Sequence, residues 1–191
     1  MLRLMSMKIC SLVFLLLPLY AIAQDISEYP KAIYEEINMV RSNPQSFVEK
    51  YDLRKLKRIK KSPELIWDDK LAKVAQEKAE DMAKNDYFDH VDPKNKGLNY
   101  YLFLDGYPLT EEYERTDRAN NAESIVASTR GPEEFVKLLI VDKGVPDKGH
   151  RKHLLGLDDF NAKHTHIGVG VSYNADAKFG YYCSILIVHR K

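Results

Sequence analysis

The spacing of the apolar residues changes along this chain, from helical repeats over most of its length to strand-like runs at its C-terminal end. The clearest helix begins after Asp68 or Asp69, either of which can cap it, and ends near Asn85. The segments 166–173 and 179–189 are apolar runs joined by a short polar loop, which is typical of a β-hairpin. Helices followed by an antiparallel pair predict an α+β fold or a layered α-β-α sandwich.

Proline marks the bounds of two further predicted helices. The helix over 28–43 ends before Pro44, because the residue preceding a proline avoids the helical region. Another helix starts at Pro132, since proline suits the first turn, and its predicted core residues are Phe135, Val136, Leu138, Leu139 and Ile140. The shorter predicted features are helical segments over 98–104 and 150–155 and a polar surface excursion over 110–120.

The N-terminal segment has the pattern of a secretory signal peptide. Arg3 and Lys8 precede a charge-free stretch over 9–23, which ends in Ala21-Ile22-Ala23, an A-x-A cleavage site. We therefore expect residues 1–23 to be removed, leaving one exported domain over 24–191 that is secreted or periplasmic. The alternative is an uncleaved membrane anchor, for which this apolar stretch is short.

Cysteine usage constrains how the exported domain is stabilised. Cleavage removes Cys10 and leaves Cys183 alone, so an internal disulfide is impossible and the fold must rest on its apolar core. Cys183 lies within the apolar run 179–188, where a small buried core residue is a better interpretation than a nucleophile.

Charge is balanced overall but locally concentrated. Lys and Arg number 29 and Asp and Glu 28, so we expect no nucleic-acid partner. One strip, over 54–61, can contact an anionic lipid or cell-wall polymer; the alternative is a solvated face. Leu53, Leu56 and Ile59 interrupt it every third residue, as in a short amphipathic turn. The basic residues are Arg54, Lys55, Lys57, Arg58, Lys60 and Lys61.

The histidines are the main candidates for chemistry. The chain contains no HExxH, GxSxG, phosphate-loop or CxxC motif, so the common local signatures of metalloproteases, serine hydrolases and nucleotide-binding proteins are missing. His150 and His153 have helical spacing, and His164 and His166 point to one side of an extended segment. Each pair is a weak metal signal, and a structural histidine is the alternative interpretation.

Several motifs occur in the order and spacing of a known domain. They are Ile37-Asn38-Met39-Val40-Arg41, Leu65-Ile66-Trp67-Asp68-Asp69-Lys70-Leu71, Phe88-Asp89-His90, Asn121-Ala122-Glu123-Ser124-Ile125, Gly149-His150-Arg151-Lys152-His153-Leu154-Leu155 and Ile167-Gly168-Val169-Gly170. Together they resemble the CAP domain, also called SCP, of cysteine-rich secretory proteins, antigen 5 and plant pathogenesis-related 1 proteins. The resemblance runs from about Ile33 to Val188 and implies a three-layer α-β-α sandwich with a mainly antiparallel central sheet. The chain is most similar to the minimal bacterial form.

The resemblance also implies a central cleft of two histidines and two acids. Carried over by motif, the histidines are His90 and His150, which would hold Zn²⁺ or another divalent cation, and the first acid is Glu123. Asp142 takes the place of the second acid, with Glu133 and Glu134 as rivals. Two neutral imidazoles leave open positions on zinc for water, and neighbouring carboxylates can accept hydrogen bonds from the rings.

Three functions fit these features. The leading hypothesis is a binding protein whose cleft holds a divalent cation and a small lipid-like, sterol-like or glycan ligand. The second is a metal-assisted hydrolase of peptidase or esterase type, in which Glu123 is the general base and His150 stabilises charge. The third is a non-catalytic surface interaction module that uses the 110–120 excursion and the basic strip over 54–61.

Overall fold

A computed structural model of the protein describes residues 25–53, 56 and 58–191. The predicted signal peptide and the basic residues Arg54, Lys55 and Lys57 lie outside them. The elements are α1 (Tyr29–Ser42), α2 (Pro44–Lys50), β1 (Ile66–Trp67), α3 (Asp69–Lys84), α4 (Leu98–Leu104), β2 (Glu123–Ser128), η2 (Pro132–Glu134), α5 (Phe135–Val141), α6 (Gly149–Leu155), η3 (Asn161–Lys163), β3 (His166–Tyr173) and β4 (Tyr181–Val188). Across these described residues, no helix is both long enough and apolar enough to cross a membrane.

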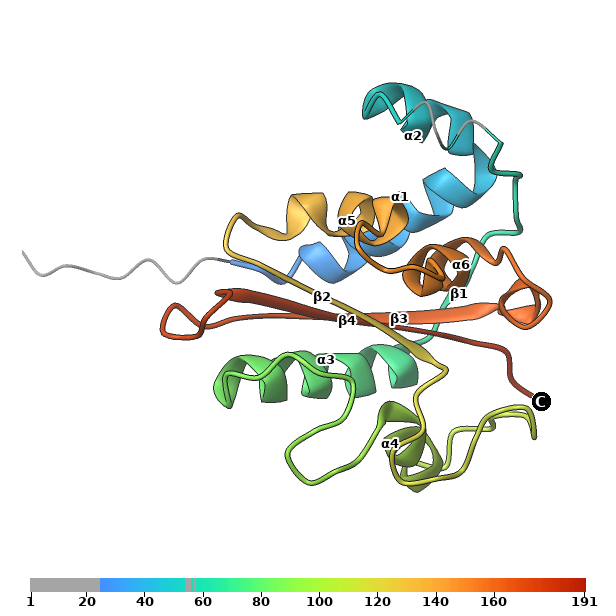
Figure 1. Ribbon diagram of the computed structural model, residues 1–191. Coiled ribbons are helices and arrows are strands. Elements are labelled where there is room, and N and C mark those ends of the chain that lie inside the picture. The colour runs from blue at the N-terminus through green and yellow to red at the C-terminus, as the bar shows by residue number, and fades with distance from the viewer. Residues whose placement is uncertain (1–24, 54–55, 57) are drawn as a thin grey trace, which may run out of the picture.

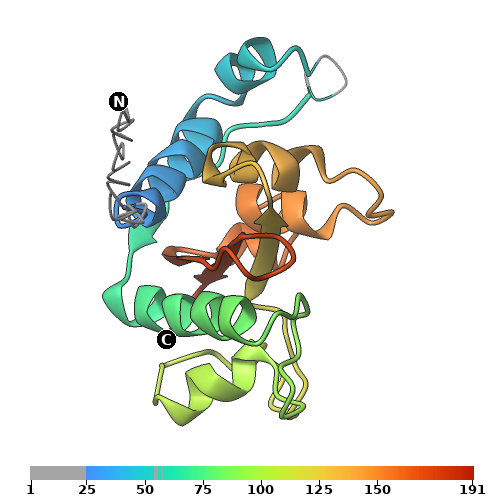
Figure 2. The same cartoon turned by 90° about the vertical axis from the view of Figure 1, so that its left-hand side faces the viewer.

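The elements form three layers around one sheet. Figure 1 shows α1, α2, α5 and α6 on one face of the sheet and α3 and α4 on the other, and Figure 2 shows the same order after a quarter turn. The strands lie in the order β1-β3-β4-β2. β4 is antiparallel to both neighbours, whereas the two-residue β1 pairs in parallel with β3. The predicted α-β-α sandwich and hairpin are therefore confirmed, with a sheet that is mixed at one edge.

Every residue of β4 is buried, because both of its faces are covered. Cys183, Ile185 and Ile187 point into the core beneath α1, α5 and α6. Leu186 and Val188, on the alternate face, pack in the core beside α3 and α4. Cys183 is a free, fully buried thiol, as its position in an apolar run predicted.

Helix α3 lies unusually close to β3. Its start is set by Asp68, whose Oδ1 accepts hydrogen bonds from the amides of Lys70 and Leu71. A Cβ atom added at Gly168 would lie 2.1 Å from the backbone nitrogen of Ala72. One added at Gly170 would lie 2.2 Å from the backbone nitrogen of Gln76. Only glycine at these two positions allows the helix backbone to contact the strand directly.

One expectation about exposure was wrong, a second holds with an exception, and one strand was missed. Leu138 is 38% exposed, because the core side of α5 is formed by its other predicted residues, such as Phe135 and Leu139. Most of the polar 110–120 segment is exposed, as predicted. Tyr113 is an exception, since it is 1% exposed and its hydroxyl accepts a hydrogen bond from the His189 amide. Strand β2 was not predicted, although Ile125 and Val126 are strand-favouring residues.

Replacing Gly170 with alanine tests the close contact between α3 and β3. The added methyl group must displace helix backbone, so we expect Gly170→Ala to lower the free energy of unfolding by about 3 kcal/mol. Gly149→Ala is the control, because the nearest atom to its added Cβ is a flexible Asp147 carboxylate oxygen at 3.3 Å. Denaturant unfolding measures both, and equal stability of the two variants would contradict the close packing.

Candidate functional site

Glu123 and His90 form the first of two imidazole–carboxylate pairs. Glu123 is the first residue of β2, and its side chain is completely buried. Its Oε2 lies 2.8 Å from Nδ1 of His90, and its Oε1 accepts a hydrogen bond of 2.7 Å from the Ser184 hydroxyl on β4. Both oxygens of the carboxylate are thus engaged, and the imidazole of His90 is held from one side.

The loop that carries His90 is held by a buried lysine. Lys78 lies on α3, and its Nζ donates to the backbone oxygens of Asp89 at 2.8 Å and His90 at 3.3 Å, and to the Tyr87 hydroxyl at 3.1 Å. Burial lowers the pKa of this lysine, although the carboxylates of Glu123 and Asp92 oppose the shift. Lys78 was not identified from the sequence, because nothing local distinguishes it from the other lysines of α3.

Asp142 and His150 form the second pair. Asp142 ends α5 in the left-handed conformation, with φ 52° and ψ 47°, and its side chain is buried. Its Oδ1 lies 2.8 Å from Nδ1 of His150, near the start of α6, and its Oδ2 accepts a hydrogen bond from the backbone amide of Arg151. Asp142 therefore occupies the same place beside His150 that Glu123 occupies beside His90.

The two pairs face each other across one cleft. The ring centroids of His90 and His150 are 6.3 Å apart and their planes are inclined by 26°. The cleft has a volume of about 350 Å³. It is lined by His90, Asn120, Asn121, Glu123, Ser124, Val145, Gly149, His150, His153, Phe160 and Asn161.

The carboxylates determine which ring nitrogen is left for a ligand. An ionised carboxylate only accepts hydrogen bonds, so in the neutral form of each imidazole the proton belongs on Nδ1 and Nε2 keeps its lone pair. A metal-binding histidine is oriented in this same way by a carboxylate. Within the described residues, no group of three or more His, Cys, Asp or Glu side chains is arranged to hold a metal ion. The donor set that the cleft offers a cation is therefore two imidazoles.

A layer of two buried histidines, His153 and His164, lies at the inner side of the cleft and stays neutral. His153 pairs through Nδ1 with the Ser124 hydroxyl at 2.8 Å and through Nε2 with the Ile187 carbonyl at 3.1 Å, and burial lowers its pKa to about 4. His164 stacks on His189 with ring centroids 5.5 Å apart. Neither ring nitrogen of His164 has a hydrogen-bond partner among the described residues, and burial lowers its pKa to about 2.

The remaining candidates lie elsewhere. The Tyr29 hydroxyl donates to Glu133, and Glu134 forms ion pairs with Arg130 and Lys137, so neither acid contacts His150. His153 is directed into the buried layer rather than paired with His150 as a ligand. His166 bonds to the neighbouring Thr165 hydroxyl, whereas the ring of His164 is buried and stacks on His189.

The fold and the paired histidines describe an α-β-α protein with an imidazole–carboxylate cleft, and the comparisons place it in a family. The model of the cysteine-rich secretory protein family, CAP, matches residues 34–186. The chain belongs to this family. It is also similar to the "Uncharacterized membrane protein YlbC" of Bacillus subtilis, with 32% identity over 144 residues, which are 74% of this chain and 36% of that protein.

Two solved structures share the fold. One is an extracellular protein containing a SCP domain from Bacillus anthracis, with a TM-score of 0.54, 22% identity, and coverage of 84% of this chain and 40% of that one. The other is an outer surface protein from Borrelia burgdorferi, with a TM-score of 0.56, 20% identity, and coverage of 87% of this chain and 96% of that one. The chain thus spans well under half of the two Bacillus proteins.

Replacing His164 with phenylalanine tests the neutral histidine layer. The pKa of His164 is lower in the folded state than its ordinary 6.5, so the unfolded chain binds more protons and stability falls as the pH drops below about 6.5. We expect the native protein to lose about 2 kcal/mol through each of His153 and His164 between pH 7 and pH 5. His164→Phe should lose about 2 kcal/mol less, as measured by denaturant unfolding at both pH values. An unchanged pH dependence would contradict the neutral, buried state of His164.

Proposed function

We propose that this CAP protein is an exported binding protein whose cleft holds a divalent cation, Zn²⁺ in the first instance, through Nε2 of His90 and His150. The observation that carries the proposal is the matched pair of imidazole–carboxylate contacts, both 2.8 Å long, on opposite sides of one cleft. The rings of His90 and His150 lie 6.3 Å apart between centroids, and a shared zinc with Zn–N bonds of about 2.0–2.1 Å would draw their Nε2 atoms to within about 4 Å of each other.

The cation would supply positive charge that attracts an oxygen of a bound ligand. The residues of the chain would orient the two imidazole rings and contact the ligand. Glu123 and Asp142 keep Nδ1 protonated and the rings in place. The amides of Asn120 and Asn121 offer hydrogen bonds, and Phe160 offers an apolar surface. A small ligand with both polar and apolar parts, a lipid-like molecule or a glycan, matches this lining.

We infer that the protein acts outside the cytoplasm, secreted or in a periplasm. The signal-peptide pattern over 1–23 supports this inference. Two proteins of the same fold, an extracellular protein and an outer surface protein, support the same inference by their names. The name of the Bacillus subtilis relative mentions a membrane, and attachment to a membrane surface is compatible with export.

Binding is better supported than hydrolysis. A general base must reach a water molecule in the cleft, yet the Glu123 side chain is fully buried and both of its oxygens already accept hydrogen bonds. We therefore propose Glu123 as a residue that positions His90. Ester and peptide hydrolysis, measured with zinc present, should give no turnover that depends on Glu123.

Calorimetric titration of the metal-free protein with zinc tests the cation site. We expect saturable binding at one site, and we expect His90→Ala and His150→Ala each to abolish measurable binding, because each removes half of the protein ligands. The control is His166→Ala, which removes a histidine outside the cleft. Absence of zinc binding in the native protein, or retained binding in both cleft variants, would remove the cation site.

A second titration tests the role of the acids. Asp142→Asn keeps the size of the side chain but weakens its hold on His150 Nδ1, so we expect zinc affinity to fall about 10- to 100-fold. Glu133→Gln is the matched control, because Glu133 was the rival acid and contacts Tyr29 instead. Equal losses in the two variants would show that Asp142 has no specific role.

A further inference from the structure

A second pocket lies on the side of α6 away from the cleft, and it shares no residue with the cleft. Its walls are Leu56 with residues 58–62, which precede β1, and Arg151 and Leu155 of α6 with the turn that follows. Its volume is about 580 Å³. The lining residues are Leu56, Arg58, Ile59, Lys60, Lys61, Ser62, Arg151, Leu155, Gly156 and Leu157.

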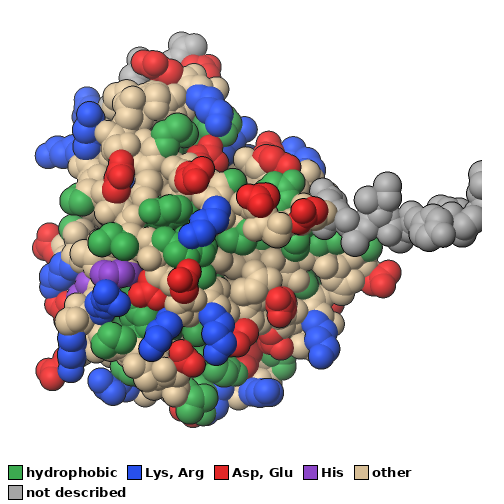
Figure 3. Space-filling model, turned by 180° about the vertical axis from the view of Figure 1, so that it is seen from behind, with side chains coloured by type: hydrophobic (Ala, Val, Ile, Leu, Met, Phe, Trp, Pro, Cys, Tyr) green, Lys and Arg blue, Asp and Glu red, His purple; other side chains and the backbone are tan. Residues whose placement is uncertain are grey.

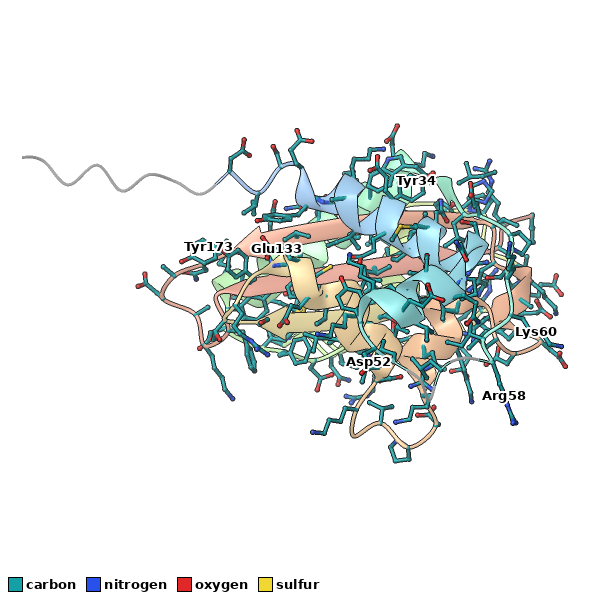
Figure 4. All side chains as sticks on the ribbon, turned by 90° about the horizontal axis from the view of Figure 1, so that it is seen from above. Tyr34, Asp52, Arg58, Lys60, Glu133 and Tyr173 are labelled. Carbon is teal, nitrogen blue, oxygen red and sulfur yellow. The ribbon has the colours of Figure 1, made fainter. Side chains whose placement is uncertain are left out.

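The charge of this pocket has one sign. Arg58, Lys60, Lys61 and Arg151 line it, and no Asp or Glu is among its described lining residues. Figure 4 shows Arg58 and Lys60 extending outward from the same edge of the molecule. On the back of the molecule, by contrast, acidic and basic side chains are interspersed (Figure 3). The pocket is therefore a local positive region on a chain with a net charge of only +1.

Arg41 holds the two walls of the pocket together from inside. Its Nε donates to the Pro63 carbonyl at 2.6 Å and its Nη1 donates to the Leu154 carbonyl at 2.8 Å. Its own carbonyl accepts from the Ser62 amide at 2.9 Å. Arg41 is 1% exposed, and burial lowers its pKa to about 10, so its guanidinium stays charged at neutral pH and adds to the potential of the pocket.

Two buried polar groups at this place lack partners among the described residues. One is the Ser62 hydroxyl, in the pocket lining, and the other is Nη2 of Arg41. Nη2 lies 3.4 Å from the position that a Cβ on Gly156 would occupy, directly beside the lining. Buried polar groups are normally hydrogen-bonded. The Ser62 hydroxyl and the Arg41 guanidinium therefore have unused hydrogen-bond donors beside four cationic side chains, and an oxyanion requires such donors.

We propose that this pocket binds a phosphate group, and that the phosphate belongs to the headgroup of an anionic lipid. Arg58, Lys60 and Lys61 would contact the phosphate charge, and Ser62 would donate a hydrogen bond to it. The lipid source is favoured by the apolar side chains interleaved with the cations, since Leu157 is 39% exposed at the rim and Leu56 and Ile59 are only partly buried. Cations beside exposed apolar groups suit a membrane surface.

The test uses the metal-free exported chain, residues 24–191. It compares binding to phosphatidylcholine vesicles with and without phosphatidylglycerol, and titrations with inorganic phosphate. We expect binding only to the anionic vesicles, weakening with salt and displaced by phosphate. Joint replacement of Arg58, Lys60 and Lys61 with alanine should lower vesicle affinity on the order of 100-fold, at about fivefold for each cation removed. The matched control replaces Lys70, Lys73 and Lys84 of α3, an equal change of charge on the opposite face.

Ser62→Ala separates a built pocket from a diffuse positive surface, because it changes no charge. We expect it to weaken both phosphate and anionic-vesicle binding several-fold, with circular dichroism confirming the fold. Three results would each overturn the proposal: unchanged binding in Ser62→Ala, equal losses of vesicle affinity in the pocket triple variant and the α3 triple variant, or phosphate binding without vesicle binding. Zinc titration of the same variants should be unaffected, so the proposal stands or falls separately from the cation site in the cleft.

Discussion

The burial of β4 on both faces and its pairing along both edges set the positions of the groups that form the cleft. Glu123 is placed by the register of β2 on β4, where it pairs with Leu186. Ser184, on β4 itself, occupies one oxygen of that glutamate, and the Ile187 carbonyl holds His153. A strand that is buried on both faces has little freedom to shift, because a slip of one residue would move each of its side chains to the core on the opposite face of the sheet. The geometry of the cleft therefore depends on the packing of the sheet.

Local sequence patterns predicted the elements whose capping and apolar-residue signals extend over several residues. α3 has a cap and a continuous apolar face, and the β3–β4 hairpin has two apolar runs and a polar loop, so both followed from spacing alone. β1 did not, because two residues become a strand only through pairing with β3. Tyr113 looked like part of a polar excursion, yet its ring packs against Phe160, far away in sequence. Such contacts arise only in the tertiary structure, so no local sequence pattern predicts them.

The cleft residues show the same limit. His90 and Glu123 are 33 residues apart and His150 and Asp142 are 8 apart, so their pairing was expected only from a resemblance between motifs. The structure brings these four side chains together, which spacing could not establish. Lys78 and Ser184 were missed because a lysine on an amphipathic helix and a serine in a strand have no distinctive sequence context. Their roles follow from burial, because a buried polar group is costly unless it forms a hydrogen bond.

Helix α6 contributes a residue to each of the two proposed sites and one to the buried histidine layer. Successive side chains of this short helix diverge. His150 faces the cleft, Arg151 lines the basic pocket, and His153 is buried against the sheet. Arg151 also donates through its guanidinium to the carbonyls of Ile140 and Val141, next to Asp142. A metal competes with protons for an imidazole, and the buried layer loses stability when it is protonated. Both demands favour neutral pH, where a phosphate diester is ionised. The two sites can therefore be occupied under the same conditions.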